Sequence, residues 1–192
     1  MTGAYKKHFV YQVDYQHWAN EVLFNSLDRL DEAGRQSAQG LFFSSIHHTV
    51  DHMLTVNKLW LGRLRREQSF PTSFNTIYQP VWRDLKNHFR AHLREMQHWL
   101  EAQSDDFFED ELHYTSSDGE RRHNWIHDIL THMMTHMAHH RGQVSAVATR
   151  LGAPAPEMDF LYYKRAMQKG LEKIAENRPH KDGANGAARV HP

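Results

Sequence analysis

Apolar residues recur every three or four positions along most of this 192-residue chain, and this spacing limits the possible fold more than any other feature. Residues three and four apart share one face of an α-helix, so such a stripe predicts a helix with one buried side. The pattern predicts four long helices, over residues 5–30, 44–66, 80–103 and 124–151, and an additional C-terminal helix over 158–177. Four long amphipathic helices predict an all-α fold, a four-helix bundle.

Turn and capping signals separate these segments. Ser44 or Ser45 is suited to cap the second helix, and Pro80 is suited to the first turn of the third. Residues 67–79 read as a loop, and Ser-Ser-Asp-Gly within residues 104–123 predicts a short hairpin-like insertion before helix four. We therefore expect one domain over residues 1–178, followed by a disordered glycine- and alanine-rich tail over 179–192.

The composition narrows the classes of function. Lys+Arg and Asp+Glu both number 23, so the chain has no net positive charge with which to attract nucleic acid. No apolar run is long enough to span a membrane, and the N-terminal residues lack the apolar segment of a signal peptide. The absence of cysteine excludes disulfides and thiolate metal ligands, and it agrees with the cytoplasmic location that we expect.

Histidine is unusually frequent, with 17 residues, and its spacing within residues 132–143 (HMMTHMAHHRGQ) is informative. His132, His136 and His140 are four apart, so they form one stripe along the predicted helix. Two imidazoles one helical turn apart can bind the same metal ion. The apolar residues of this helix share the face of His136 and His140, which favours these two as ligands and leaves His132 and His139 at the rim.

Two histidines cannot complete a coordination sphere, so a third ligand must come from another helix. The second predicted helix offers His47, His48 and His52, of which His52 shares a face with apolar residues and Arg63. The third predicted helix offers three competitors, His88, His92 and His98. Three imidazoles with one free position suit zinc, and imidazole also binds nickel, copper and iron.

The chain resembles the DinB/YfiT-like family over residues 5–165. The resemblance rests on three motifs, YQHWAN at residues 15–20, SIHHTVDH at 45–52 with WLGR at 60–63, and HMAHHRGQ at 136–143. It implies a four-helix bundle in which His52, His136 and His140 hold one divalent metal ion, with zinc or nickel favoured over iron or manganese. Asn57 departs from the family pattern, which often has an acidic residue five positions after the first metal ligand.

The resemblance also implies a class of activity. Some members of the family are thiol-dependent transferases or isomerases, so we expect a metalloenzyme that activates water or a low-molecular-weight thiol, of the thiol S-transferase or hydrolase type. Its partners would be a small-molecule substrate and, by the same resemblance, a second copy in a homodimer. The alternatives are a non-catalytic metal-binding stress protein and a haem-binding bundle.

Two residues next to the histidine stripe carry weaker signals. Arg141 is suited either to an anionic substrate group or to a salt bridge between helices. Gly142 interrupts a predicted helix, where glycine costs about 1 kcal/mol relative to alanine. This cost predicts that another helix approaches closely at Gly142.

Overall fold

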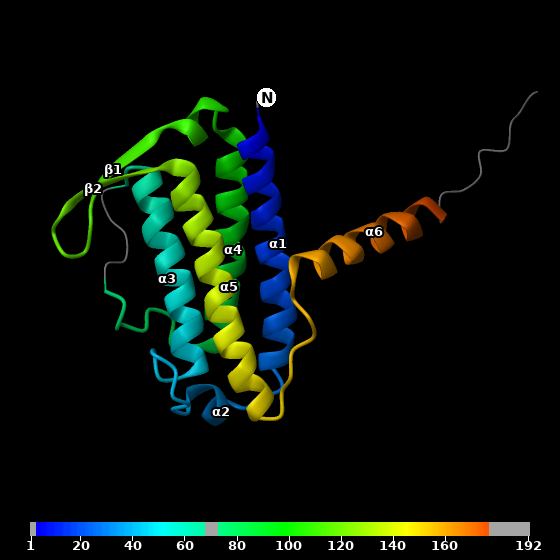
Figure 1. The fold of residues 1–192 in the computed structure, drawn as a ribbon. Helices are drawn as coiled ribbons and strands as arrows, with labels where there is room; N and C mark the ends of the chain where they lie inside the picture. The colour runs from blue at the N-terminus through cyan, green and yellow to red at the C-terminus, as the bar shows by residue number, and fades with distance from the viewer. Residues whose placement is uncertain (1–2, 68–72, 177–192) are drawn as a thin grey trace, which may run out of the picture.

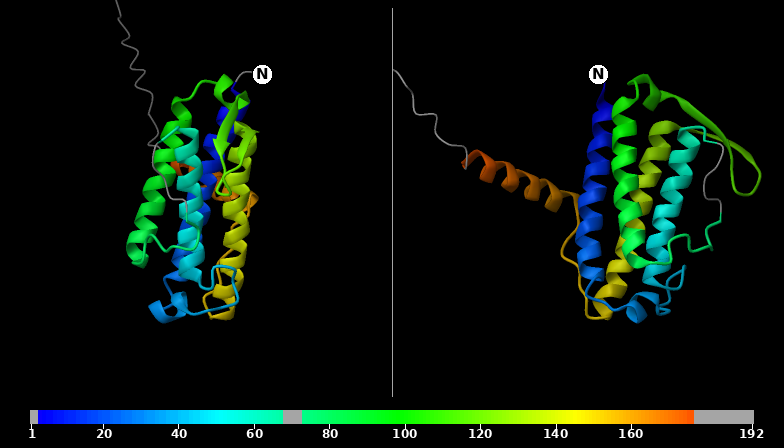
Figure 2. Two further views of the ribbon diagram at one scale, coloured as in Figure 1. Left: turned by 90° about the vertical axis from the view of Figure 1, so that its left-hand side faces the viewer. Right: turned by 180° about the vertical axis from the view of Figure 1, so that it is seen from behind.

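The computed structural model describes residues 3–67 and 73–176. Four long helices pack side by side in it: α1 (Ala4–Leu27), α3 (Ile46–Leu64), α4 (Trp82–Ala102) and α5 (Ile126–Arg150) (Figure 1). The contacts α1–α4, α4–α3, α3–α5 and α5–α1 close a ring around one core. α1 and α5 run in one direction and α3 and α4 in the other (Figures 1 and 2). The predicted all-α fold is confirmed.

The apolar stripes of the four helices meet in this core as their spacing predicted. Leu23, Ile46, Leu85 and Met133, one from each helix, are completely buried. A helix that buries one stripe against two neighbours obtains most of its stability from this packing and little from its own propensity. The core therefore fixes the relative rotation of α3 and α5, which determines which of their histidines face each other.

The helix ends differ in detail from the prediction. Ser45 is the N-cap of α3, because its Oγ accepts a hydrogen bond of 3.1 Å from the backbone N–H of His48. The placement of Pro80 in the first turn of a helix is wrong, since α4 begins at Trp82 after Val81 as its N-cap. A short helix that was not predicted, α2 (Glu32–Gln36), follows α1 and is capped by Asp31.

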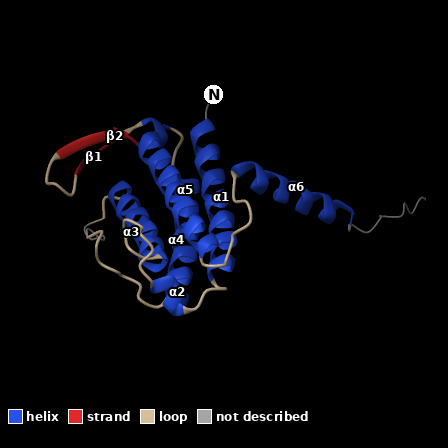
Figure 3. Ribbon diagram, turned by 60° about the horizontal axis from the view of Figure 1, so that its bottom comes forward, coloured by secondary structure: helices blue, strands red, loops and turns tan. Residues whose placement is uncertain are grey.

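The insertion before α5 is a hairpin, as predicted. A 3-10 turn, η1 (Asp106–Glu109), leads into β1 (Glu111–Thr115), which pairs antiparallel with β2 (Arg121–Trp125) (Figure 3). The register runs from Glu111 opposite Trp125 to Thr115 opposite Arg121. The guanidinium of Arg63, at the end of α3, donates a 3.1 Å hydrogen bond to the carbonyl oxygen of Thr115 and so ties the hairpin to the bundle.

The additional C-terminal helix is α6 (Phe160–Glu176), which points away from the bundle (Figures 1 and 2). Its first turn packs on α1, where the buried Tyr163 contacts the rings of Tyr11, Tyr15 and Trp18. The tail that we predicted to be disordered, residues 179–192, lies outside the described residues. Within the described part of the chain, the helices are too short or too polar to cross a membrane.

Candidate metal centre

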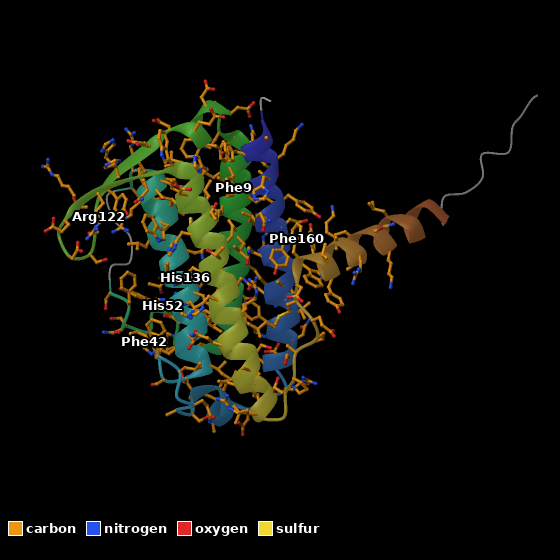
Figure 4. The ribbon with its side chains drawn as sticks, in the orientation of Figure 1. Phe9, Phe42, His52, Arg122, His136 and Phe160 are labelled. Atoms are coloured by element: carbon orange, nitrogen blue, oxygen red, sulfur yellow. The ribbon has the colours of Figure 1, made fainter. Side chains whose placement is uncertain are left out.

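His52, His136 and His140 lie together between α3 and α5, and each offers one ring nitrogen within 4.8 Å of the other two (Figure 4). His52 belongs to the second turn of α3, whereas His136 and His140 are one turn apart in the middle of α5. The structure therefore brings together the three residues that the resemblance implied. Their role as metal ligands stays a prediction.

The spacing of the two α5 histidines suits a shared metal ion. Their Nε2 atoms are 3.1 Å apart. Two nitrogens bound tetrahedrally at zinc–nitrogen distances of 2.0–2.1 Å would be separated by about 3.3 Å. Little movement would be needed for both atoms to bind one ion.

A hydrogen bond at the far side of His140 sets the protonation of its ring. Nδ1 of His140 lies 2.7 Å from Oε1 of Gln143. Because the amide oxygen accepts only, Nδ1 must donate its proton to it, which leaves a lone pair on Nε2 of the neutral ring. Gln143 thus directs that lone pair toward His136, as a residue that supports a metal ligand does.

All three rings are held in the neutral form that binds metal. Burial and, to a smaller extent, the nearby His140 lower the pKa of His52 to about 4 and that of His136 to about 3. Burial also lowers the pKa of His140, against an opposing contribution from its hydrogen bond to Gln143. The Nδ1 atoms of His52 and His136 are buried without a hydrogen-bond partner among the described residues. A cluster of three neutral imidazoles, each with one ring nitrogen within 4.8 Å of the others, fits a divalent metal ion.

Aromatic rings from two loops enclose His52. Phe43 stacks on the imidazole, with ring centroids 3.7 Å apart, and is held there by a tight turn in which Ser44 has a φ of 64°. Phe74 approaches from the other loop, with a centroid distance of 5.9 Å. The Asp51 carboxylate anchors this second loop by accepting hydrogen bonds of 3.0 and 2.8 Å from the backbone N–H groups of Tyr78 and Gln79.

A cavity of about 520 Å³ extends from His52 and His136 along the bundle to the hairpin. One wall is the face of α3 that carries Val56, Leu59 and Trp60, and α5 contributes His132. The hairpin closes the far end, near Arg63. This volume lies within the usual range for a small-molecule site.

Within the described residues, the other candidate histidines lie outside this group of three, although His132 and His139 contact its rings. His132 lines the cavity, and its ring centroid is 5.5 Å from that of His136, so its predicted position at the rim agrees with the structure. Nε2 of His47 lies 2.7 Å from the backbone carbonyl oxygen of Gln79, and His48 packs on Phe43. The competitors on α4 are absent from the group: His88 and His98 are exposed, and His92 is buried alone. The three site rings contact one another directly, with centroids 4.4 to 5.2 Å apart, which leaves no room for a porphyrin between them.

Neither role predicted for Arg141, contact with an anionic substrate group or a salt bridge between helices, agrees with the structure. Its side chain faces α1 and points away from the cavity. Its guanidinium is buried and donates to the side-chain oxygens of Gln16, Asn20 (3.2 Å) and Tyr15 (3.3 Å). These acceptors are neutral, so the contact is not a salt bridge. It joins the motif at residues 15–20 to the motif at 136–143.

The structure also shows the surroundings of Gly142 and Asn57. No described atom outside the local helix lies within 4 Å of a Cβ added at Gly142, so the predicted close helix approach is wrong. Asn57 is completely buried, and its Nδ2 donates to the carbonyl oxygen of Met53 one turn earlier in α3. Asn57 is absent from the residues that line the cavity.

The fold and this cluster define a class of protein, a helical bundle with three histidines positioned to bind one metal ion. The sequence supports the same conclusion at the level of family, because the model of the DinB family matches residues 6–177. The chain belongs to the DinB family. A search among curated proteins finds no match to it.

Proposed function

We propose that this protein is a metalloenzyme that holds one divalent metal ion with His52, His136 and His140. The observation that carries the proposal is the convergence of three neutral imidazoles at the end of a cavity large enough for a small molecule. A divalent metal with a free coordination position makes water or a thiol acidic enough to act as a nucleophile near neutral pH.

The number of ligands favours an open site over a purely structural one. Structural zinc sites are closed by four protein ligands, whereas catalytic sites have three and keep one position free. Among the described residues, the group contains three histidines and no carboxylate. The second candidate, a non-catalytic metal-binding protein, would need a fourth ligand to close the site.

The surrounding residues would position a substrate. Phe43 and Phe74 shield His52 from water, and Gln143 fixes the ring of His140. The apolar face of α3 would hold the body of the substrate beside the metal ligands. We infer zinc or nickel as the metal, and water or a low-molecular-weight thiol as the activated group. Action in the cytoplasm and assembly as a homodimer are further parts of this proposal.

Metal content is the first test. Protein prepared without a polyhistidine tag should contain about one equivalent of metal by mass spectrometry, and His52→Ala and His140→Ala should each lose it. His98→Ala is the matched control, because His98 is exposed on α4 and lies outside the group. Metal that is absent from the wild type, or retained by both site variants, would contradict the proposal.

Catalysis needs a separate measurement. The loaded protein should turn over substrates in a screen of thiol transfer and hydrolysis, and chelation should abolish this activity. If chelation instead lowers the melting temperature by many degrees and no turnover is found, the non-catalytic alternative is favoured.

A further inference from the structure

The far end of the cavity contains a second polar feature, Arg63. It lies on the same face of α3 as His52, eleven residues later, which corresponds to about 16 Å along the helix axis. The side chains of His52 and Arg63 both lean toward the helix N-terminus, so the lean changes this distance little. A metal–ligand bond of about 2 Å and a hydrogen bond of about 3 Å would occupy part of the distance, which leaves about 10 Å for the body of a bound molecule. The cavity therefore has a candidate metal site at one end and a cation at the other.

The guanidinium of Arg63 is held in place by aromatic rings. Its central carbon lies 4.7 Å from the ring centroid of Trp60 and 4.8 Å from that of Tyr114. One N–H group donates to the carbonyl oxygen of Thr115. These contacts orient the planar group before any ligand arrives, which reduces the entropy lost on binding.

The charge of Arg63 has no acidic partner among the described residues. Burial lowers the pKa of its guanidinium, and no carboxylate contributes in the opposite direction. The C-terminal end of α3 supplies a partial negative charge, which stabilises the cation without occupying its N–H donors. A guanidinium has five such donors, so most of them remain available for a ligand.

The other charged groups of the cavity neutralise each other. Asp118, in the turn of the hairpin, accepts a 2.7 Å hydrogen bond from the guanidinium of Arg122 and further bonds from Ser116 and the backbone of Glu120. Arg122 lies on the same side of the bundle as His52 and His136 (Figure 4). The pair therefore contributes little net charge, and Arg63 leaves the cavity with an excess of one positive charge.

We propose that Arg63 binds the carboxylate of the substrate, a small organic anion with an apolar body about 10 Å long. The planar fork of an arginine matches a carboxylate in two parallel hydrogen bonds. Val56, Leu59 and Trp60 line the space between the two ends and fit an aliphatic or aromatic body. This inference deepens the proposed function, because it names the class of substrate that the metal centre would act on.

The first test uses metal-free protein, so it does not depend on the metal. Calorimetric titration should show that phenylbutyrate binds about tenfold or more tightly than phenylbutyramide, which has the same body without the charge. Arg63→Gln should remove this preference, and Arg63→Lys should restore only part of it. Arg83→Gln, at an exposed arginine of α4, is the matched control and should keep the preference.

Equal affinities for acid and amide, or an unchanged preference in Arg63→Gln, would overturn the assignment. The second result would show that the carboxylate binds at a group other than Arg63. Circular dichroism of Arg63→Gln, together with its unchanged affinity for the amide, separates loss of the charge from loss of the fold. Failure of this test leaves the metal-content result intact, so the two proposals can fail independently.

A second titration tests whether the metal site and Arg63 bind the same molecule. On cobalt-loaded protein, the thiolate-to-cobalt absorption band should appear at a lower concentration of mercaptohexanoate than of mercaptohexanol, by about tenfold or more. Arg63→Gln should make the two thiols equivalent. A band of equal midpoint for both thiols in the wild type would show that the carboxylate does not reach Arg63.

Discussion

Gln143 contacts the candidate metal site through one hydrogen bond, to the ring of His140. It fixes both the tautomer and the direction of the His140 ring, while its own side chain stays outside the group of three. A residue of this kind is a positioning residue, because it influences the metal only through the ligand that it holds.

We predict that Gln143→Leu lowers metal affinity about tenfold to a hundredfold, because the His140 ring loses the acceptor that fixes its tautomer. Gln143→Glu should retain most of the affinity, since a carboxylate oxygen accepts the same bond. Competition with a chromophoric chelator measures both values. Equal affinities for wild type and Gln143→Leu would show that the ring is held by packing alone.

The residues of the site differ in how far the sequence predicts them. His136 and His140 follow from helical spacing and the apolar face that they share. His52 shares a face with apolar residues, but choosing it over His47, His48 and the histidines of α4 needed the resemblance. Phe43 could not be predicted, since its place over His52 depends on the left-handed conformation of Ser44 in a loop.

At the scale of elements, α5 contacts two neighbouring helices through different faces. One face carries the histidines toward α3, and the other carries Arg141 into the amide and hydroxyl oxygens of α1. Gly142, the residue after Arg141, faces outward and is exposed. A glycine without a packing neighbour gives the helix only the entropic cost of its missing side chain.

We therefore predict that Gly142→Ala stabilises the protein by about 1 kcal/mol, because an alanine Cβ meets no described atom at this position. Urea unfolding followed by circular dichroism measures the change, with metal content as the control for an intact site. A loss of stability would mean that another surface covers Gly142 in solution, and the oligomeric state of both proteins would then be compared.

The elements themselves were largely predictable from the sequence, and their ends were not. A stripe of apolar residues over five turns specifies a helix, whereas the exact start depends on local hydrogen bonds. Pro80 shows this, because it precedes the N-cap of α4 although its fixed φ suits a first turn. The direction of α6 could not be predicted from the sequence either, because only its first turn packs against the bundle.

At the scale of the whole molecule, the ring of four helices buries a histidine, His92, that is far from the candidate metal ligands in sequence. His92 on α4 is 4% exposed, and its Nε2 has no hydrogen-bond partner among the described residues. Its pKa is lowered to about 4, mainly by burial, with smaller lowering contributions from Lys58 and Arg65 and an opposing one from Glu95. The neutral ring is therefore part of the folded state.

This group makes stability depend on pH in a defined direction. Below about pH 6.5 the unfolded chain binds a proton at His92 that the folded chain excludes until about pH 4, so stability falls over this window as pH decreases. We predict that His92→Leu reduces this loss in metal-free protein by roughly 2 kcal/mol at about pH 5. Urea unfolding at several pH values measures it, and parallel curves for the two proteins would contradict the shift.

The cavity is lined by elements that differ in local stability, because the helices belong to the core and the hairpin does not. α3 and α5 belong to the buried core, so their amide protons would exchange only when much of the bundle unfolds. Every residue of β2 is exposed, and a two-stranded ribbon has little stability of its own. Its anchors are the bond from Arg63 to Thr115 and the contact of Tyr114 with Trp60. Arg63 thus also holds the hairpin against the bundle. Local opening of the hairpin would let a molecule enter or leave the cavity while the helices remain folded.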